Sequence, residues 1–448
     1  MENKDTMDMD TEIEEYLKKR KADKENAEGE AKESEPDKVS PTARRGKERA
    51  PHSYHEKIGF SERDYFDYAG YKRRKPKLEK NKNAKKIFGR IMIIFASVLL
   101  FAIISVYGLC YTIAKGPSET VRDLLVLSAK QASATKWVPS LFLPQSEIDA
   151  ILAQSEEVNK DVISLDDYYS QGSTNEETKD EWADAKDGML FHTIKGSTYT
   201  AYMLIVKDPS RVFVGASNAD FSTAEKGKTI FEITSSYGAV AAINGGEFPD
   251  GGGVGTGHRP IGLTYSGGKC VWNDSLKRTF IGFDKDNKLV VSESMTKSEA
   301  DALGIRDAVS FQTGNVLISS DGENITFYYA EGNKGTAQRT AIGQRADGAV
   351  ILLVTDGRTA SSLGATHNDV IDIMVQYGAV NAAMLDGGSS AMMYYEKYYE
   401  KYGYDYDSLD QYQKKGLVNK YKAFTTPRHM PTFFMVAPLT EGGENNAN

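Results

Sequence analysis

The sequence predicts an α+β fold: a mixed β-sheet domain with flanking helices, preceded by one transmembrane helix. Two observations indicate the sheet domain. Short apolar runs typical of buried strands recur in the second half of the chain, and helical patterns that end at a glycine lead into them. A third observation, a long uncharged run further upstream, indicates the membrane helix.

Composition narrows the possible functions. The chain has 448 residues, enough for a large core, and its net charge of -8 argues against a general nucleic-acid binder. Its two cysteines, Cys110 and Cys270, lie in different segments, so no intrachain disulfide is expected. No histidine or cysteine spacing suggests a metal site, and the sequence predicts no cofactor.

The N-terminal segment is the first element along the chain. Residues 1–86 are polar and rich in Lys and Glu, which predicts a disordered cytoplasmic tail. The alternative is that this tail is a docking site for an intracellular partner.

The next element is the run from Ile91 to Ala114, which has 24 uncharged residues. About 20 residues are needed to cross the hydrocarbon core as a helix, and we place the transmembrane helix at residues 87–114. Between Lys72 and Arg90 there are ten basic residues and one acidic residue, and the positive side of a membrane helix stays in the cytoplasm. The sequence therefore predicts a single-pass protein of the cell membrane with a cytoplasmic N-terminus and an extracellular C-terminal domain.

Residues 115–188 are predicted to form a helical stalk followed by an acidic linker. Ser146 and Asp149 have the spacing of a capping motif at the start of a short helix. The part from residue 165 to 188 is acidic and polar, which is typical of a linker or loose surface.

The β-rich pattern occupies residues 189–440, and residues 441–448 form a polar tail. Two strand patterns, at 198–206 and 211–215, predict a hairpin that is joined by a Pro-containing turn.

A helix is expected after this hairpin. Ser222 and Glu225 have the spacing of a capping box, and Gly238 is a typical helix stop. A similar helical pattern from Asn368 to Tyr377 is closed by Gly378, and an apolar strand pattern follows in both places.

Three apolar strand patterns end in a polar residue and glycine. The groups that follow them are Asn244-Gly245-Gly246, Asp356-Gly357-Arg358 and Asp386-Gly387-Gly388. A lone Asp-Gly is usually a turn, but two of them closing very apolar strands favour a shared polar site. Ligands often bind at the carboxyl edge of a sheet, and we expect these strand ends to meet there.

Further polar side chains lie near these strand ends in the sequence. They are Glu247, Arg339, Thr366, Ser389, Ser390 and Arg428. The arginines could form structural ion pairs with carboxylates, or they could bind an anion, because guanidinium matches phosphate oxygens bidentately.

Several other motifs are absent or weak. The glycine-rich loop at residues 251–257 has neither Walker nor Rossmann spacing, and there is no Gly-x-Ser-x-Gly elbow. Residues 284–288 resemble a calcium loop but lack its closing Glu, so a hairpin turn is expected. The tyrosine-rich segment at 394–413 could stack on sugar rings, or it could pack on the domain or form a lid.

Taken together, these motifs resemble the phosphodiester glycosidase family. The resemblance covers roughly residues 190 to 440 and rests on five segments in the family's order: Asn244 to Phe248, Arg339 to Gly343, Val354 to Arg358, Gly364 to Thr366 and Leu385 to Ser390. Members act on N-acetylglucosamine-1-phosphodiesters or are related to bacterial exopolysaccharide biosynthesis. Two positions depart from the usual pattern: Glu247 replaces an aromatic residue, and Asp369 replaces a Glu.

The resemblance implies a membrane-anchored extracytoplasmic hydrolase that cleaves a sugar-1-phosphodiester at the anomeric C–O bond, in cell-surface polysaccharide or wall-polymer metabolism. It implies Asp386 as nucleophile or electrostatic partner, Asp356 as second carboxylate and Glu247 as a candidate acid or base. The implied substrate-binding residues are Asn244, Gly245, Arg339, Arg358, Thr366, Gly387, Gly388, Ser389, Ser390 and Arg428.

Two other function classes stay open. One is a phosphodiesterase that cleaves the P–O bond on the same fold. The other is a non-catalytic protein that binds cell-surface glycans or phosphodiester polymers. Paired carboxylates beside an anion favour catalysis, because a binding protein does not need them.

Overall fold

The protein is described from a computed structural model. The structure describes residues 82–130, 135–172, 181–183, 185, 187–250, 255–331, 335–357, 362–421 and 426–439. Residues 1–81 of the expected N-terminal tail lie outside the described residues. Arg358 and the expected C-terminal tail lie outside them as well.

The apolar run forms a long helix, α2 (Lys82–Lys115). Within its part from Lys86 to Lys115, the most apolar window of 18 residues has a mean hydropathy of 2.6, and no residue of that window is buried inside the protein. α2 is therefore long and apolar enough to span a membrane. The direction in which it crosses stays a prediction.

Three short helical elements follow: α3 (Glu119–Lys130), η1 (Pro139–Leu141) and α4 (Gln145–Glu156). Their small core contains Ala114, Val126, Leu127, Phe142, Leu143, Ile148 and Ile151. The expected cap at Ser146 is wrong, because α4 already begins at Gln145, directly after Pro144, and no side chain caps it. The extended backbone at Pro144 sets the helix start instead.

The main sheet has eight strands in the order β1-β12-β11-β15-β13-β14-β3-β2, and each pairing between them is antiparallel. The strands are β1 (Val158–Ser164), β2 (Met189–Lys195), β3 (Thr200–Val206), β11 (Val316–Ser320), β12 (Asn324–Ala330), β13 (Thr340–Arg345), β14 (Val350–Thr355) and β15 (Ala379–Leu385). β1 and the helix after it, α5 (Leu165–Gly172), precede residue 189. The sheet thus includes the end of the segment expected to be the stalk, α5 lies in the expected linker, and the domain boundaries stay a prediction.

Two smaller sheets complete the β-structure, with orders β7-β6-β10-β8-β9 and β16-β5-β17-β4. Their strands are β4 (Val212–Ala216), β5 (Ala241–Asn244), β6 (Thr264–Ser266), β7 (Lys269–Trp272), β8 (Thr279–Phe283), β9 (Leu289–Ser292), β10 (Asp307–Phe311), β16 (Met393–Tyr395) and β17 (Thr432–Val436). β8 and β9 form the hairpin expected around residues 284–288.

The hairpin expected between β3 and β4 is wrong, because β3 pairs within the main sheet and β4 pairs with β17. A short 3-10 turn, η2 (Pro209–Arg211), redirects the chain between them, and the Asp208 side chain accepts a hydrogen bond from Ser210 N there. Strand periodicity identifies a strand but not its partner.

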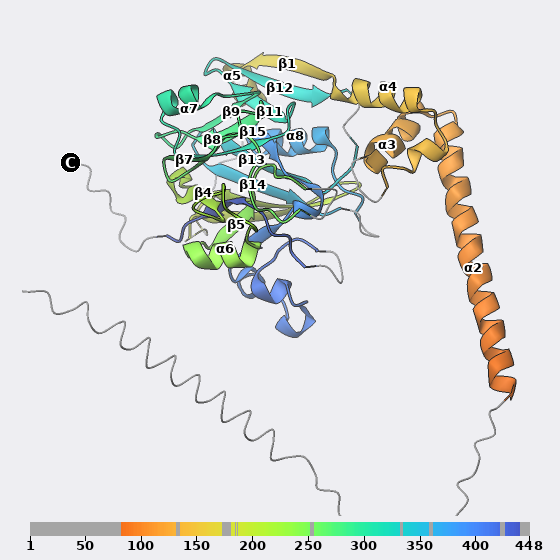
Figure 1. Ribbon diagram of the computed structural model, residues 1–448. Coiled ribbons are helices and arrows are strands. Elements are labelled where there is room, and N and C mark those ends of the chain that lie inside the picture. The colour runs from red at the N-terminus through yellow and green to blue at the C-terminus, as the bar shows by residue number, and fades with distance from the viewer. Residues whose placement is uncertain are drawn as a thin grey trace, which may run out of the picture. The chain divides into compact units, whose positions relative to one another are not determined.

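The helices that flank the sheets are α6 (Ile230–Tyr237), α7 (Lys297–Leu303), α8 (His367–Gln376) and α9 (Tyr398–Lys401), with 3-10 turns η3 (Gly388–Ser390), η4 (Tyr406–Ser408) and η5 (Gln413–Lys415). α8 packs on β12 and β15 (Figure 1). The expected start of α6 at Ser222 is wrong, because Ser222 hydrogen-bonds Asp220 in a turn, and the capping box is formed by Thr229 and Glu232. Gly238 ends α6 with a φ of 63°, as expected.

The centre of the main sheet positions the polar strand ends. Every residue of β14 is buried, and most of β15 is buried as well. β13 pairs antiparallel with both, so that Thr340 faces Val354 on one side and Leu385 on the other. β14 and β15 therefore run in the same direction and end at the same edge. Helices and sheets together confirm the predicted α+β class.

Candidate functional site

Asn244 ties the ends of β5, β13 and β15 together. It is fully buried, and its Nδ2 donates to the backbone oxygen of Asp386 at 2.5 Å. Its Oδ1 accepts from the Thr340 hydroxyl at 2.8 Å and from Met392 N at 3.1 Å. A buried amide with all these partners is a strong positional constraint. The structure thus brings Asn244 next to Asp386. The hydrogen bonds of the Asn244 side chain hold the strand ends together.

The glycines at these strand ends allow the backbone to pack closely. A Cβ on Gly245 would lie 2.5 Å from the Thr432 hydroxyl oxygen, and one on Gly387 would lie 2.7 Å from the Gln338 carbonyl oxygen. Gly388 has a φ of 61° and donates its N–H to the same carbonyl of Gln338. These glycines are needed for the geometry of the edge.

Asp386 lies among charged and polar groups on this edge. Asp386 as a whole residue is half-buried, and the surrounding protein withdraws its carboxyl from water and raises its pKa to about 7. A hydrogen bond from Ser390 and the nearby cation of Arg428 oppose this rise, while the carboxylates of Asp250 and Glu247 add to it. We call these five residues, Asp386, Ser390, Arg428, Asp250 and Glu247, the Asp386 cluster.

Arg428 is the cation of this cluster. Its guanidinium donates to the hydroxyls of Ser389 at 3.2 Å and Ser390 at 3.3 Å, and it forms an ion pair with Asp250. The guanidinium carbon also lies 4.9 Å from the centre of the Phe248 ring. Its side chain is only 13% exposed, so Arg428 presents a fixed, largely desolvated cation beside Asp386.

Glu247 directly follows Gly245 and Gly246, the two glycines after β5. Its carboxylate accepts a hydrogen bond from Arg278 Nε at 2.7 Å, and the two side chains are 15% and 27% exposed. Its backbone N–H donates to the Ser310 oxygen, which fixes the turn after Gly246. An ion pair of this geometry holds Glu247 in one orientation near Asp386.

Asp356 ends β14 at the same edge but has other partners. Its carboxylate accepts from the Tyr202 hydroxyl at 2.9 Å and from Lys420 N at 2.9 Å. Burial raises its pKa, while these hydrogen bonds and the Lys420 charge lower it. The hydrogen-bond partners of the Asp356 carboxylate, Tyr202 and Lys420, are not members of the Asp386 cluster.

The other predicted substrate-binding residues have structural partners. Arg339 donates to the backbone oxygens of Ala365 at 3.1 Å and Gly335 at 2.8 Å. The Thr366 hydroxyl and Asp369 form the capping box that starts α8. Both side chains hold loops around the edge, while Arg358 lies outside the described residues.

Sequence reasoning missed two members of this site. Asp250 follows Phe248 closely and precedes a glycine-rich loop, so its pattern was that of a turn. Arg278 precedes β8 and is separated from Glu247 by 31 residues. The only available signal was the position of Asp250 directly before the glycine-rich loop at residues 251–257.

The next groups considered are metal-binding side chains and the histidine beside Arg428. Among the described residues, no group of three or more His, Cys, Asp or Glu side chains is arranged to hold a metal ion. His429, next to Arg428, lies 3.8 Å from the Glu232 carboxylate, and burial lowers its pKa.

Part of the chain matches a known family model. Residues 237–437 match the family model described as phosphodiester glycosidase. This range contains all residues of the Asp386 cluster. Over 53 residues the chain is 43% identical to an uncharacterized SPbeta prophage-derived protein, YomE, of Bacillus subtilis (strain 168), which corresponds to 12% of this chain and 8% of that protein.

Solved structures show weaker likeness. The zebrafish N-acetylglucosamine-1-phosphodiester alpha-N-acetylglucosaminidase catalytic domain, auto-inhibited by its pro-peptide, is 17% identical over 63% of this chain and 89% of that chain, with a TM-score of 0.43. An exported protein of Burkholderia pseudomallei K96243 is 14% identical over 54% of this chain and 74% of that chain, with a TM-score of 0.36. A hypothetical protein from Synechocystis is also 14% identical, over 57% of this chain and 62% of that chain, with a TM-score of 0.36. At these values the likenesses do not by themselves identify an activity.

Proposed function

We propose, on the premise that residues 237–437 belong to the phosphodiester glycosidase family, that the protein hydrolyses a sugar-1-phosphodiester at the anomeric C–O bond. The observation that carries the proposal is the pairing of Asp386 with Arg428. A carboxyl whose pKa is raised to about 7 lies beside a largely buried cation on the edge of the main sheet. Perturbed carboxyls next to a fixed charge are typical of catalytic sites.

Each residue has a role that follows from the chemistry. As the C1–O bond breaks, its electron pair leaves with the phosphate oxygen, and Arg428 stabilises that charge. The ionised Asp386 faces the anomeric carbon and stabilises or traps the oxocarbenium-like centre. Water then adds to C1, and its proton passes to Glu247 or Asp250. A phosphate is a weak base, so the leaving group needs little protonation.

The proposal also includes the orientation of the protein in the membrane and the location of its substrate. The chain acts from the membrane through α2, with the N-terminus in the cytoplasm and the C-terminal domain outside. Its substrate is a carbohydrate phosphodiester of cell-surface polysaccharide or wall polymer, of the N-acetylglucosamine-1-phosphodiester kind. Protease accessibility of the two ends of the chain in intact cells tests this orientation.

The test is hydrolysis by the full chain in detergent micelles of an N-acetylglucosamine-1-phosphodiester. Asp386→Asn should lower kcat on the order of 10³-fold, and Arg428→Met roughly 10²-fold. The matched controls are Asp161→Asn on the exposed strand β1 and Arg345→Met at the end of β13, where Arg345 is half-buried and pairs with Asp347, and both should keep wild-type rates. Full activity of Asp386→Asn would remove this residue from the reaction. Tight binding without turnover would favour the non-catalytic alternative.

A further inference from the structure

The tyrosine-rich segment divides into a buried part and an exposed part. Tyr395, Tyr398 and Tyr399 are buried and belong to the main core. Tyr406 differs, because it is 62% exposed and is the most exposed tyrosine among the described residues. Packing accounts for the first group but leaves the exposed ring of Tyr406 without a structural role.

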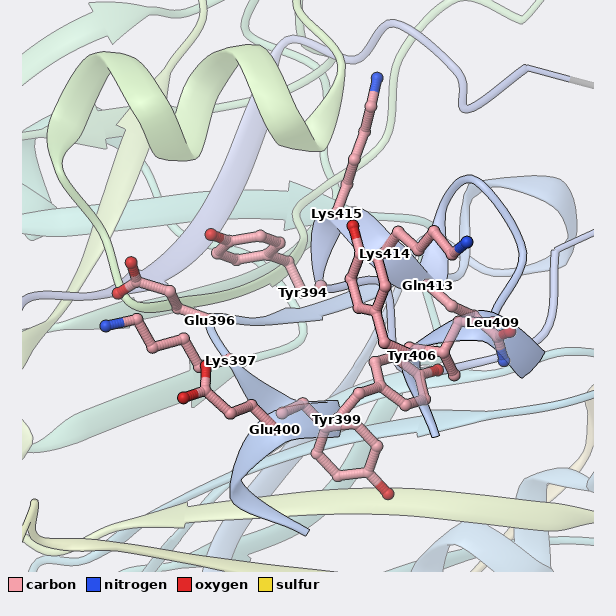
Figure 2. Close-up of a pocket in the computed structure, with 12 residues that line it drawn as sticks. Tyr394, Glu396, Lys397, Tyr399, Glu400, Tyr406, Leu409, Gln413, Lys414 and Lys415 are labelled. Carbon is pink, nitrogen blue, oxygen red and sulfur yellow. The ribbon is translucent and has the colours of Figure 1, made fainter. Parts of the chain in front are cut away.

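A cavity of about 290 Å³ lies beside Tyr406. Figure 2 shows Lys414 beside Tyr406, the end of the Lys415 side chain pointing away from Tyr406, and Lys397 and Glu400 on another side of the same hollow. The cavity also has Tyr394 and Glu396 in its wall. None of its lining residues belongs to the Asp386 cluster, so it is a separate site.

The charges of the cavity fit a ligand that has both an anion and hydroxyl groups. Lys414 Nζ lies 4.8 Å from the centre of the Tyr406 ring. Among the described residues Lys397 and Lys414 form no ion pair, so their charges are available. The Lys415 ammonium lies 5.6 Å from the centre of the Phe231 ring, which is not part of the cavity wall. The carboxylates in the wall, Glu396 and Glu400, accept hydrogen bonds from hydroxyls and repel a purely anionic ligand.

The loops around the cavity are held in place before any ligand binds. The Asp405 side chain accepts from Asp407 N, and the Asp410 side chain accepts from Tyr412 N and Gln413 N. Lys397 has a φ of 54°, a left-handed conformation that is uncommon outside glycine. Such residues are concentrated at binding and catalytic sites.

We propose that this cavity is an accessory site for a phosphorylated sugar. The sugar ring lies against the open face of Tyr406, its phosphate lies against the ammonium of Lys414, and its hydroxyls donate to Glu396 and Glu400. An aromatic ring offers a flat apolar surface to the ring of the sugar, and ammonium groups bind phosphate as point charges. The site goes beyond the hydrolysis proposed above and does not depend on it.

Calorimetry on the full chain in detergent micelles tests the site with three probes: glucose 6-phosphate, glucose and inorganic phosphate. Glucose 6-phosphate should bind saturably, and at least tenfold more tightly than either of the others. Tyr406→Ala and Lys414→Gln should each weaken its binding at least fivefold. Tyr169→Ala and Lys285→Ala remove an exposed ring and an exposed lysine that do not line the cavity, and should leave binding unchanged.

Three results would overturn the site: no saturable binding of glucose 6-phosphate, equal binding of glucose or phosphate alone, or wild-type binding by both cavity variants. Hydrolysis of a small soluble sugar-1-phosphodiester by the same variants separates this inference from the proposed function. The cavity variants should keep that activity. An inactive wild-type chain that still binds glucose 6-phosphate through Tyr406 and Lys414 would refute the hydrolase and retain the accessory site.

Discussion

Asp386→Asn should stabilise the protein while it removes the proposed activity. In the folded state, burial raises the pKa of Asp386 from its ordinary value of 3.8 to about 7. At 1.36 kcal/mol for each pH unit, full ionisation of this carboxyl costs the folded state about 4 kcal/mol relative to the unfolded chain. Because the residue is only half-buried, screening by solvent reduces this to about 2 kcal/mol.

The sign follows from proton binding. Between the two pKa values the folded state keeps the proton of Asp386 and the unfolded chain has lost it. The wild-type free energy of unfolding therefore falls as the pH rises from about 4 to about 7. The variant has no such proton, so its advantage over the wild type should grow by about 2 kcal/mol between pH 4 and pH 8.

The assay is urea unfolding of both full chains in detergent micelles, followed by tryptophan fluorescence at pH 4 and pH 8. Asp161→Asn, on an exposed part of β1, is the control for the substitution itself. The reasoning is refuted if the difference between Asp386→Asn and the wild type is the same at both pH values. It is also refuted if the variant is the less stable protein at pH 8.

Three further predictions concern other parts of the account. Arg428→Met should raise the pKa of Asp386 further, because the Arg428 cation lowers it, and the rising limb of the pH–rate profile should move to higher pH. Asn244→Ala removes three hydrogen bonds of a buried side chain and should lower the free energy of unfolding in urea by about 2 to 4 kcal/mol, and a loss below about 1 kcal/mol would contradict the role of Asn244 in holding the strand ends together. Leu100→Arg in α2 should disfavour membrane insertion by about 3 kcal/mol, measured as the membrane-bound fraction after carbonate extraction.

The sequence was sufficient for the elements with strong local signals. β14 and β15 are long apolar runs, so their bounds and their polar ends were predictable. α8 was predictable as well, because its apolar residues have helical spacing and Gly378 follows its end. The shared edge also followed, because several strands ended in the same chemical pattern.

The pairing of strands and the partners of side chains were not predictable. β3 and β4 are close in sequence but belong to different sheets. Arg428 and Asp250 meet across 178 residues, and no local pattern encodes such a contact. Asp356 and Asp386 had equivalent sequence contexts, and only their three-dimensional neighbours distinguish them: Tyr202 and Lys420 for Asp356, Arg428 for Asp386.

The central claim is cleavage of the anomeric C–O bond. Hydrolysis of an N-acetylglucosamine-1-phosphodiester by the full chain in ¹⁸O-labelled water tests it most directly, with mass spectrometry of the phosphomonoester product. The account predicts free sugar and a phosphomonoester without ¹⁸O, because water adds to the anomeric carbon. A phosphomonoester that carries ¹⁸O, or the release of sugar-1-phosphate, would show cleavage of a P–O bond and contradict the account.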